Sequence, residues 1–161
     1  MTDARPADLA ARAAERRVVV IGGGISGLVA ARECDYAGLI AYPSTPGLEM
    51  WAALYQRVHR SNGGEPDAGR RLKEWARDAG LTDLDAGASV WCFSTDDERA
   101  WWGGMWRDRV LQSAFAGDAL GKGFASRLDL EAISFAWAQW AEDPRGYMIF
   151  PHGELVARKG G

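Results

Sequence analysis

Two folds are compatible with the segment Val18-Val19-Val20-Ile21-Gly22-Gly23-Gly24-Ile25-Ser26-Gly27-Leu28-Val29-Ala30-Ala31-Arg32-Glu33. It begins with four β-branched residues in a row, a pattern typical of a strand buried on both faces. A glycine-rich turn follows. The next residues, 28–33, are compatible with a helix or with a second strand, and the two assignments lead to different folds.

If 28–33 is a helix, the glycines indicate a nucleotide site. Gly22, Gly24 and Gly27 spell G-x-G-x-x-G directly after a strand. In such a site the first glycine makes the tight turn, the second lets backbone amides approach a pyrophosphate, and the third lets the helix pack on the strand. Residues 18–31 resemble the N-terminal signature of two-dinucleotide-binding flavoproteins, such as amine or protoporphyrinogen oxidases, which implies FAD or NAD as cofactor.

The sequence after this motif departs from a dinucleotide-binding unit. Such a unit needs a second strand ending in an acidic residue that holds the ribose. Here Pro43 interrupts the apolar run 39–42, and Ser44 and Thr45 occupy the place of the acid. The alternative is a glycine-rich turn that binds no ligand.

The rest of the chain alternates helix and strand signals, which predicts an α/β fold. Helix formers fill 7–16, and Thr45 with Pro46 starts a helix that ends at 61–64. A second helix follows Pro66, with Gly80 as its C-cap. A strand is expected at 88–93, and a Thr95–Glu98 capping box begins the next helix, which Gly103 and Gly104 weaken. A further helix runs from Leu130 to Pro144. Residues 147–157 form either a bulged strand or a tight hairpin.

A second resemblance begins at Gly27 and covers residues 27–159. Gly27-Leu28-Val29-Ala30-Ala31-Arg32-Glu33-Cys34-Asp35-Tyr36 resembles the fifth-strand region of class I S-adenosylmethionine-dependent methyltransferases. The similarity continues through the segments 51–55, 61–70, 90–93, 101–106 and 146–158. It implies that 28–33 is a strand. The implied fold is an incomplete Rossmann-like methyltransferase C-terminal half with inserted helices.

The resemblance also implies S-adenosylmethionine as the methyl donor, but only the second half of such an enzyme is matched. The donor-binding strand, its acidic residue and its Gly-x-Gly turn precede the fifth strand in this family, and 26 residues stand before Gly27 here. We therefore divide the chain into a leader or short helix (1–16), a strand with a glycine-rich loop (17–27) and a methyltransferase-like region (28–161). The donor-binding half is expected to be missing.

Several residues are candidates for a site on an acceptor substrate. Asp35 and Tyr36 follow the predicted strand at its carboxyl end, where α/β sheets place ligands, so the acid could orient an acceptor or take its proton. The alternative is a helix cap or a loop hydrogen bond. Trp91, Trp102 and Trp106 either line an apolar pocket or belong to the core. His152 and Glu154 could pair on one strand face, and no metal site is predicted from His59 and His152.

Composition excludes several classes of protein. The 161 residues are 47% hydrophobic and 25% charged, with 19 Lys and Arg against 22 Asp and Glu, so we expect no general affinity for nucleic acid. No apolar run is long enough to cross a bilayer. Cys34 and Cys92 form no CxxC pair, which favours reduced thiols in a cytoplasmic protein.

The sequence predicts methyl transfer to a small acceptor, with an FAD/NAD-binding oxidoreductase fragment as the first alternative. The second alternative is a non-catalytic interaction domain, and exposed sheet edges would favour a homo-oligomer.

Overall fold

The computed structural model describes residues 27–159. The expected helix at 7–16, the expected strand at 18–21, and Gly22 and Gly24 lie outside the described residues. The fold is mixed α/β with an antiparallel sheet. Its elements are β1 (Leu28–Cys34), η1 (Tyr36–Gly38), β2 (Ile40–Tyr42), α2 (Pro46–Ser61), α3 (Ala68–Asp78), β3 (Leu81–Phe93), α4 (Asp96–Gln112), α5 (Ala114–Gly121), α6 (Arg127–Glu142) and β4 (Tyr147–Lys159).

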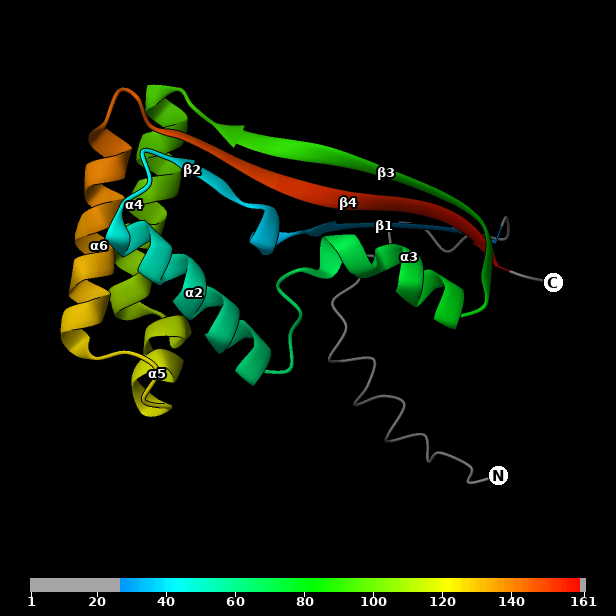
Figure 1. Cartoon of the computed structure of the whole chain (residues 1–161), viewed down its shortest axis with the longest axis horizontal. Helices are drawn as coiled ribbons and strands as arrows, with labels where there is room; N and C mark the ends of the chain where they lie inside the picture. The colour runs from blue at the N-terminus through cyan, green and yellow to red at the C-terminus, as the bar shows by residue number, and fades with distance from the viewer. Residues whose placement is uncertain (1–26, 160–161) are drawn as a thin grey trace.

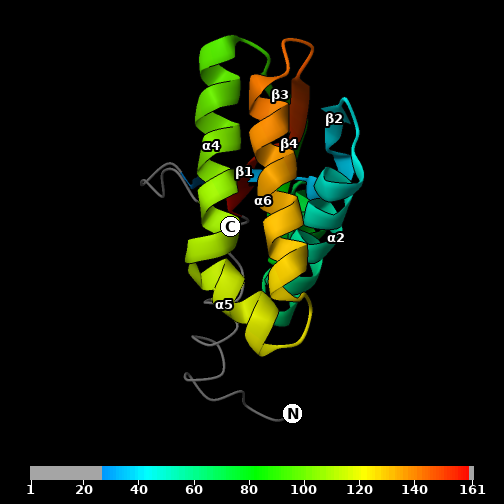
Figure 2. The ribbon, with the colours of Figure 1, turned by 90° about the vertical axis from the view of Figure 1, so that its left-hand side faces the viewer.

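Two layers of helix contact the sheet at opposite ends (Figure 1). Helices α2, α4, α5 and α6 gather at one end of the long strands, and α3 lies along the other half. Viewed from the helical end, α4 and α6 stand side by side with α2 next to α6 (Figure 2).

The strand β1 resolves the ambiguity of residues 28–33. It pairs antiparallel with β4, from Leu28 opposite Arg158 to Cys34 opposite His152. Gly27 has φ +65°, and its carbonyl accepts a hydrogen bond of 2.7 Å from the N–H of Lys159. A G-x-G-x-x-G nucleotide turn requires a helix after the third glycine. The assignment of 28–33 to a helix is therefore wrong, and the strand implied by the methyltransferase resemblance is confirmed.

Strand β4 forms the centre of the sheet. It pairs with β1 and β2 along one edge and with β3 along the other. Of the two possibilities for 147–157, the structure shows a single continuous strand. Pro151 lies opposite Asp35, just beyond the end of β1, where its carbonyl accepts the N–H of Asp35 at 2.9 Å. Its missing N–H therefore costs a bond only at the end of that pairing. The register irregularity lies instead in β3, between Thr82 and Asp85.

The helix ends follow the local sequence signals closely. Thr45 accepts a hydrogen bond from the N–H of Leu48 with Pro46 in the first turn, and the predicted capping box of Thr95 and Glu98 is present. Gly80 lies one residue beyond the C-cap, with φ +73°, rather than at the cap itself. Neither α5 nor the second capping box, formed by Ser126 and Asp129, was predicted from the sequence. Strand β3 begins seven residues before the expected start.

The two halves of β4 pack into two separate hydrophobic cores on opposite faces of the sheet. Met148 and Phe150 face the helical end, where they pack with tryptophans of α2, α4 and α6. Leu155 and Ala157 face the other side of the sheet, where α3 covers them. This change of side follows from the two-residue period of a strand, because 148 and 150 share one face while 155 and 157 share the other.

Candidate functional site

Asp35 lies just after β1, where its side chain is held by hydrogen bonds within the protein. Its carboxylate receives two hydrogen bonds from Arg70, Nε to Oδ2 at 2.6 Å and Nη2 to Oδ1 at 2.7 Å. Its Oδ1 also accepts the N–H of Gly38 at 3.2 Å, which caps η1. The residue is 8% exposed. The structure therefore shows the loop-capping role that was the alternative for this residue, together with a bidentate ion pair.

Tyr36 packs its ring between α2 and β4. It stacks on Tyr55 at 4.2 Å between ring centroids and meets Phe150 edge-on at 5.4 Å. Burial, followed by the charge and hydrogen bond of Tyr55, raises the pKa of Tyr36 above its ordinary value. The phenol is therefore protonated at neutral pH.

The three tryptophans do not surround a common cavity. Trp106 is 1% exposed and meets Trp51 edge-on at 4.8 Å, and Trp102 stacks on Phe93 at 4.5 Å. Trp91 lies apart on β3, 44% exposed, with its ring 4.4 Å from that of His152. Trp102 and Trp106 lie in the larger core, as the core alternative describes.

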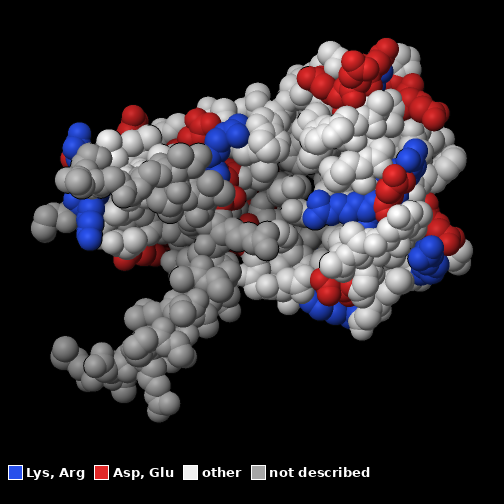
Figure 3. Space-filling view, turned by 180° about the vertical axis from the view of Figure 1, so that it is seen from behind, with Lys and Arg blue, Asp and Glu red and all other residues white. Residues whose placement is uncertain are grey.

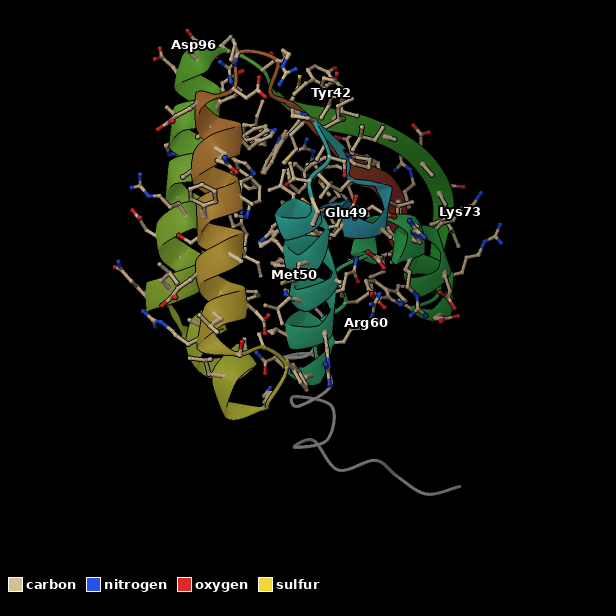
Figure 4. All side chains as sticks on the ribbon, turned by 60° about the vertical axis from the view of Figure 1, so that its left-hand side comes forward. Tyr42, Glu49, Met50, Arg60, Lys73 and Asp96 are labelled. Atoms are coloured by element: carbon tan, nitrogen blue, oxygen red, sulfur yellow. The ribbon has the colours of Figure 1, made fainter. Side chains whose placement is uncertain are left out.

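A shallow hollow among the described residues runs along α2. It consists of two adjoining depressions of about 330 Å³ and about 420 Å³, which share Leu39 and Ala52. We call it the α2 groove. Its lining is Tyr36, Ala37, Leu39, Ile40, Ala41, Ser44, Leu48, Glu49, Trp51, Ala52, Ala53, Gln56, Arg60, Asp67 and Met148. Figure 4 shows Glu49 near the beginning of α2 and Arg60 near its end.

Polar groups stand at both ends of this groove. At one end the hydroxyl of Ser44 donates to Oε1 of Glu49 at 2.7 Å. At the other, Asp67 accepts from Nε2 of Gln56 at 2.7 Å and from Nη2 of Arg60 at 2.6 Å. Burial raises the pKa of Asp67, but hydrogen bonds from Gln56, the N–H of Ala37 and Arg60 outweigh it, and the pKa is lowered. The groove thus has a mainly apolar floor and charged ends.

This groove was not predicted from the sequence. A helical signal for it exists, because Ala52, Gln56 and Arg60 recur at every fourth position and therefore share one side of α2. Nothing in the sequence indicated that η1 and β2 would form the opposite wall, because neither element was predicted.

His152 pairs with Cys34 rather than with Glu154. Its Nδ1 lies 3.0 Å from the carbonyl oxygen of Phe150, which can only accept, so Nδ1 carries the proton and Nε2 receives the thiol of Cys34 at 2.8 Å. Burial raises the pKa of Cys34 to about 11 and lowers that of His152. Both groups are therefore neutral at pH 7. Glu154 accepts instead from Arg32 at 2.8 Å and from Ser89 at 2.6 Å.

Residues 27–159 do not fit S-adenosylmethionine by themselves. Their strand pairs are all antiparallel, and no strand among them is followed by a glycine loop and a helix that could hold a nucleotide.

The same residues hold no group of three or more His, Cys, Asp or Glu side chains suited to a metal ion. Their helices are too short or too polar to span a membrane. On the face seen in Figure 3, basic and acidic side chains lie close together rather than in one basic patch.

A comparison with known proteins supports a methyltransferase relationship. No family model matches the chain. The chain is 30% identical over 136 residues to a protein of Schizosaccharomyces pombe named "Uncharacterized methyltransferase C1B3.06c". The match covers 83% of this chain and 48% of the relative, so the chain spans about half the relative's length.

Proposed function

We propose that this chain supplies the acceptor-binding part of an S-adenosylmethionine-dependent methyltransferase. The observation that carries this proposal is the 30% identity over 136 residues to a protein named as a methyltransferase. The strand β1 adds support, because it is the element that the family resemblance requires and that a flavin- or nicotinamide-binding unit would replace with a helix. Elements beyond residues 27–159 would hold the donor.

The acceptor would bind in the α2 groove. A floor of Leu39, Ala52 and Met148 suits a small, largely apolar molecule, because burying its surface removes apolar area from water. The carboxylate of Glu49 already accepts a hydroxyl hydrogen bond from Ser44. A hydroxyl or amine on the acceptor could take the place of Ser44, and Glu49 would then orient the group that receives the methyl.

Other candidate residues would act by shaping this groove. Tyr36 lines it directly, and Asp35 anchors the η1 wall by binding Arg70 of α3. Under this proposal Asp35 is a positioning residue. Trp102 and Trp106 would support the groove only through the core beneath Trp51.

A hybrid enzyme tests the proposal. The 136-residue segment of the Schizosaccharomyces pombe relative is replaced by the matching segment of this chain, and both proteins are incubated with S-adenosylmethionine carrying a labelled methyl group and a small-molecule extract of the yeast. We expect label in the organic phase with the relative and with the hybrid. Ala52→Trp in the hybrid should abolish transfer by filling the middle of the groove.

The control is Ala100→Trp, which places the same side chain on an exposed position of α4 away from the groove. It should leave transfer intact. An active relative with an inactive but folded hybrid would contradict the proposal. Equal activity in the Ala52→Trp and Ala100→Trp hybrids would leave methyl transfer standing and exclude the groove as acceptor site.

A further inference from the structure

Charge is unevenly distributed along the α2 groove. Its charged residues are Glu49 at one end and Arg60 with Asp67 at the other. Arg60 donates from Nη2 to Asp67 at 2.6 Å and to Glu65 at 3.2 Å, so no positive charge is left over at that end. No Lys or Arg of residues 27–159 forms an ion pair with Glu49. The groove therefore offers a ligand one unpaired carboxylate and no unpaired cation.

The two ends are too far apart for Arg60 to offset the charge of Glu49. Arg60 follows Glu49 by eleven positions on α2, which at 1.5 Å per residue is about 16 Å. The Debye length at physiological ionic strength is about 8 Å, so charges at this separation are largely screened from each other. At Glu49 itself, Ser44 donates to Oε1, and the described residues place no donor on Oε2. That oxygen is therefore available to a donor on a ligand.

The lining of the groove also lacks a residue that could take the proton of an aliphatic alcohol. It contains no His, Cys or Lys. Burial, above all, raises the pKa of Tyr36, so its phenol stays protonated. Asp67 is occupied by hydrogen bonds from Gln56 and Arg60. An alcohol becomes a good nucleophile only when a base removes its proton, whereas the nitrogen of a neutral amine carries a lone pair of its own.

We propose that the acceptor bound in the α2 groove is an apolar amine, with its nitrogen at Glu49 and its apolar part against Leu39 and Ala52. This inference rests on the proposed function for the role of the groove, and it narrows the acceptor from a hydroxyl or amine compound to an amine. The ammonium form supplies both the positive charge that complements Glu49 and an N–H donor for Oε2. An alcohol supplies only the donor, and a carboxylic acid would be repelled.

Binding of three probes with the same alkyl chain tests the inference: hexylamine, hexanol and hexanoate. Each is titrated into the isotope-labelled full chain, and the backbone amide shifts report both the place of binding and the dissociation constant. We expect shifts at Leu39 and Ala52 with all three probes. Hexylamine should bind about two- to fivefold more tightly than hexanol at low ionic strength, as a partly exposed ion pair allows, and hexanoate should bind most weakly. Salt at about 0.5 M should remove most of this preference.

Two matched variants locate the charge that is responsible. Glu49→Gln should bring the affinity for hexylamine down to that for hexanol and leave hexanol unchanged. Asp97→Asn is the control, because Asp97 is also an exposed acid in the first turn of a helix, α4, but lies outside the groove. It should keep the full preference for hexylamine.

Each of the other results would overturn the inference. These are equal affinities of the wild-type chain for hexylamine and hexanol, a preference that survives Glu49→Gln, a preference lost equally in Asp97→Asn, and shifts that fall outside the groove or do not occur with any probe.

The methyl-transfer hybrid separates this inference from the proposed function. An active hybrid whose labelled product is a methyl ether would leave the proposed function standing and overturn the choice of an amine. An inactive hybrid, together with selective binding of hexylamine at Glu49, would contradict methyl transfer and leave amine recognition standing. The probe titrations need no methyl donor, so the two results are independent.

Discussion

Two adjacent glycines in α4 allow a direct test of how closely α4 and α6 pack. Both lie within the unbroken helix Asp96–Gln112. A Cβ added at Gly103 would lie 2.8 Å from the Cβ of Ala141 and 3.1 Å from the carbonyl oxygen of Trp137, both on α6. A Cβ at Gly104 would meet nothing within 4 Å. The same substitution should therefore have opposite effects at the two positions.

The magnitudes follow from two competing terms. Glycine inside a helix costs about 0.5–1 kcal/mol relative to alanine, so Gly104→Ala should stabilise the protein by about that amount. At Gly103 the same gain is offset by overpacking, which typically costs about 1–3 kcal/mol. Gly103→Ala should therefore destabilise by roughly 1–2 kcal/mol, and the two variants should differ by about 2 kcal/mol.

Urea unfolding followed by tryptophan fluorescence measures both free energies, given a common denaturant slope. A third variant identifies the cause, because Ala141→Gly should restore most of the stability that Gly103→Ala removes. Equal or greater stability of Gly103→Ala relative to Gly104→Ala would refute the close packing of the two helices. Absence of rescue by Ala141→Gly would refute the assigned contact.

Four further results are expected. Because the pKa of His152 is lowered in the folded protein, the imidazole of the unfolded chain is protonated first as the pH falls. The free energy of unfolding should therefore decrease as the pH drops below 6.5. In urea titrations, His152→Gln should reduce this pH dependence. Because the pKa of Cys34 is raised from 9.0 to about 11, stability should also fall between those pH values, and Cys34→Ser should remove that decline. Arg70→Met should lower the unfolding free energy, because it removes the cation that pairs with the buried carboxylate of Asp35. Arg71→Met, which breaks a part-exposed pair with Glu65 and an exposed pair with Glu74, should cost less, and equal costs would contradict the role of Asp35. Calorimetry of residues 27–159 with millimolar S-adenosylmethionine should show no heat of binding, and saturable heat would locate a donor site within them.

Features that depend on neighbouring residues could be predicted from the sequence. Thr45 with Pro46 and Thr95 with Glu98 predicted helix starts, because capping involves groups three residues apart. The apolar run at 147–150 and the residues after Pro151 predicted extended chain. The family resemblance, rather than local pattern, predicted β1, since Leu28–Glu33 has no decisive period of its own.

The contacts between these elements became known only from the three-dimensional structure. The pairing of Asp35 with Arg70 and of His152 with Cys34 joins residues far apart in the chain, and no local spacing encodes such contacts. The three-residue strand β2 exists because β4 offers it an edge, although Pro43 follows it immediately. The α2 groove likewise requires η1, β2 and α2 to meet. Local signals arise from backbone geometry over a few residues, whereas a site depends on which distant surfaces are buried against one another.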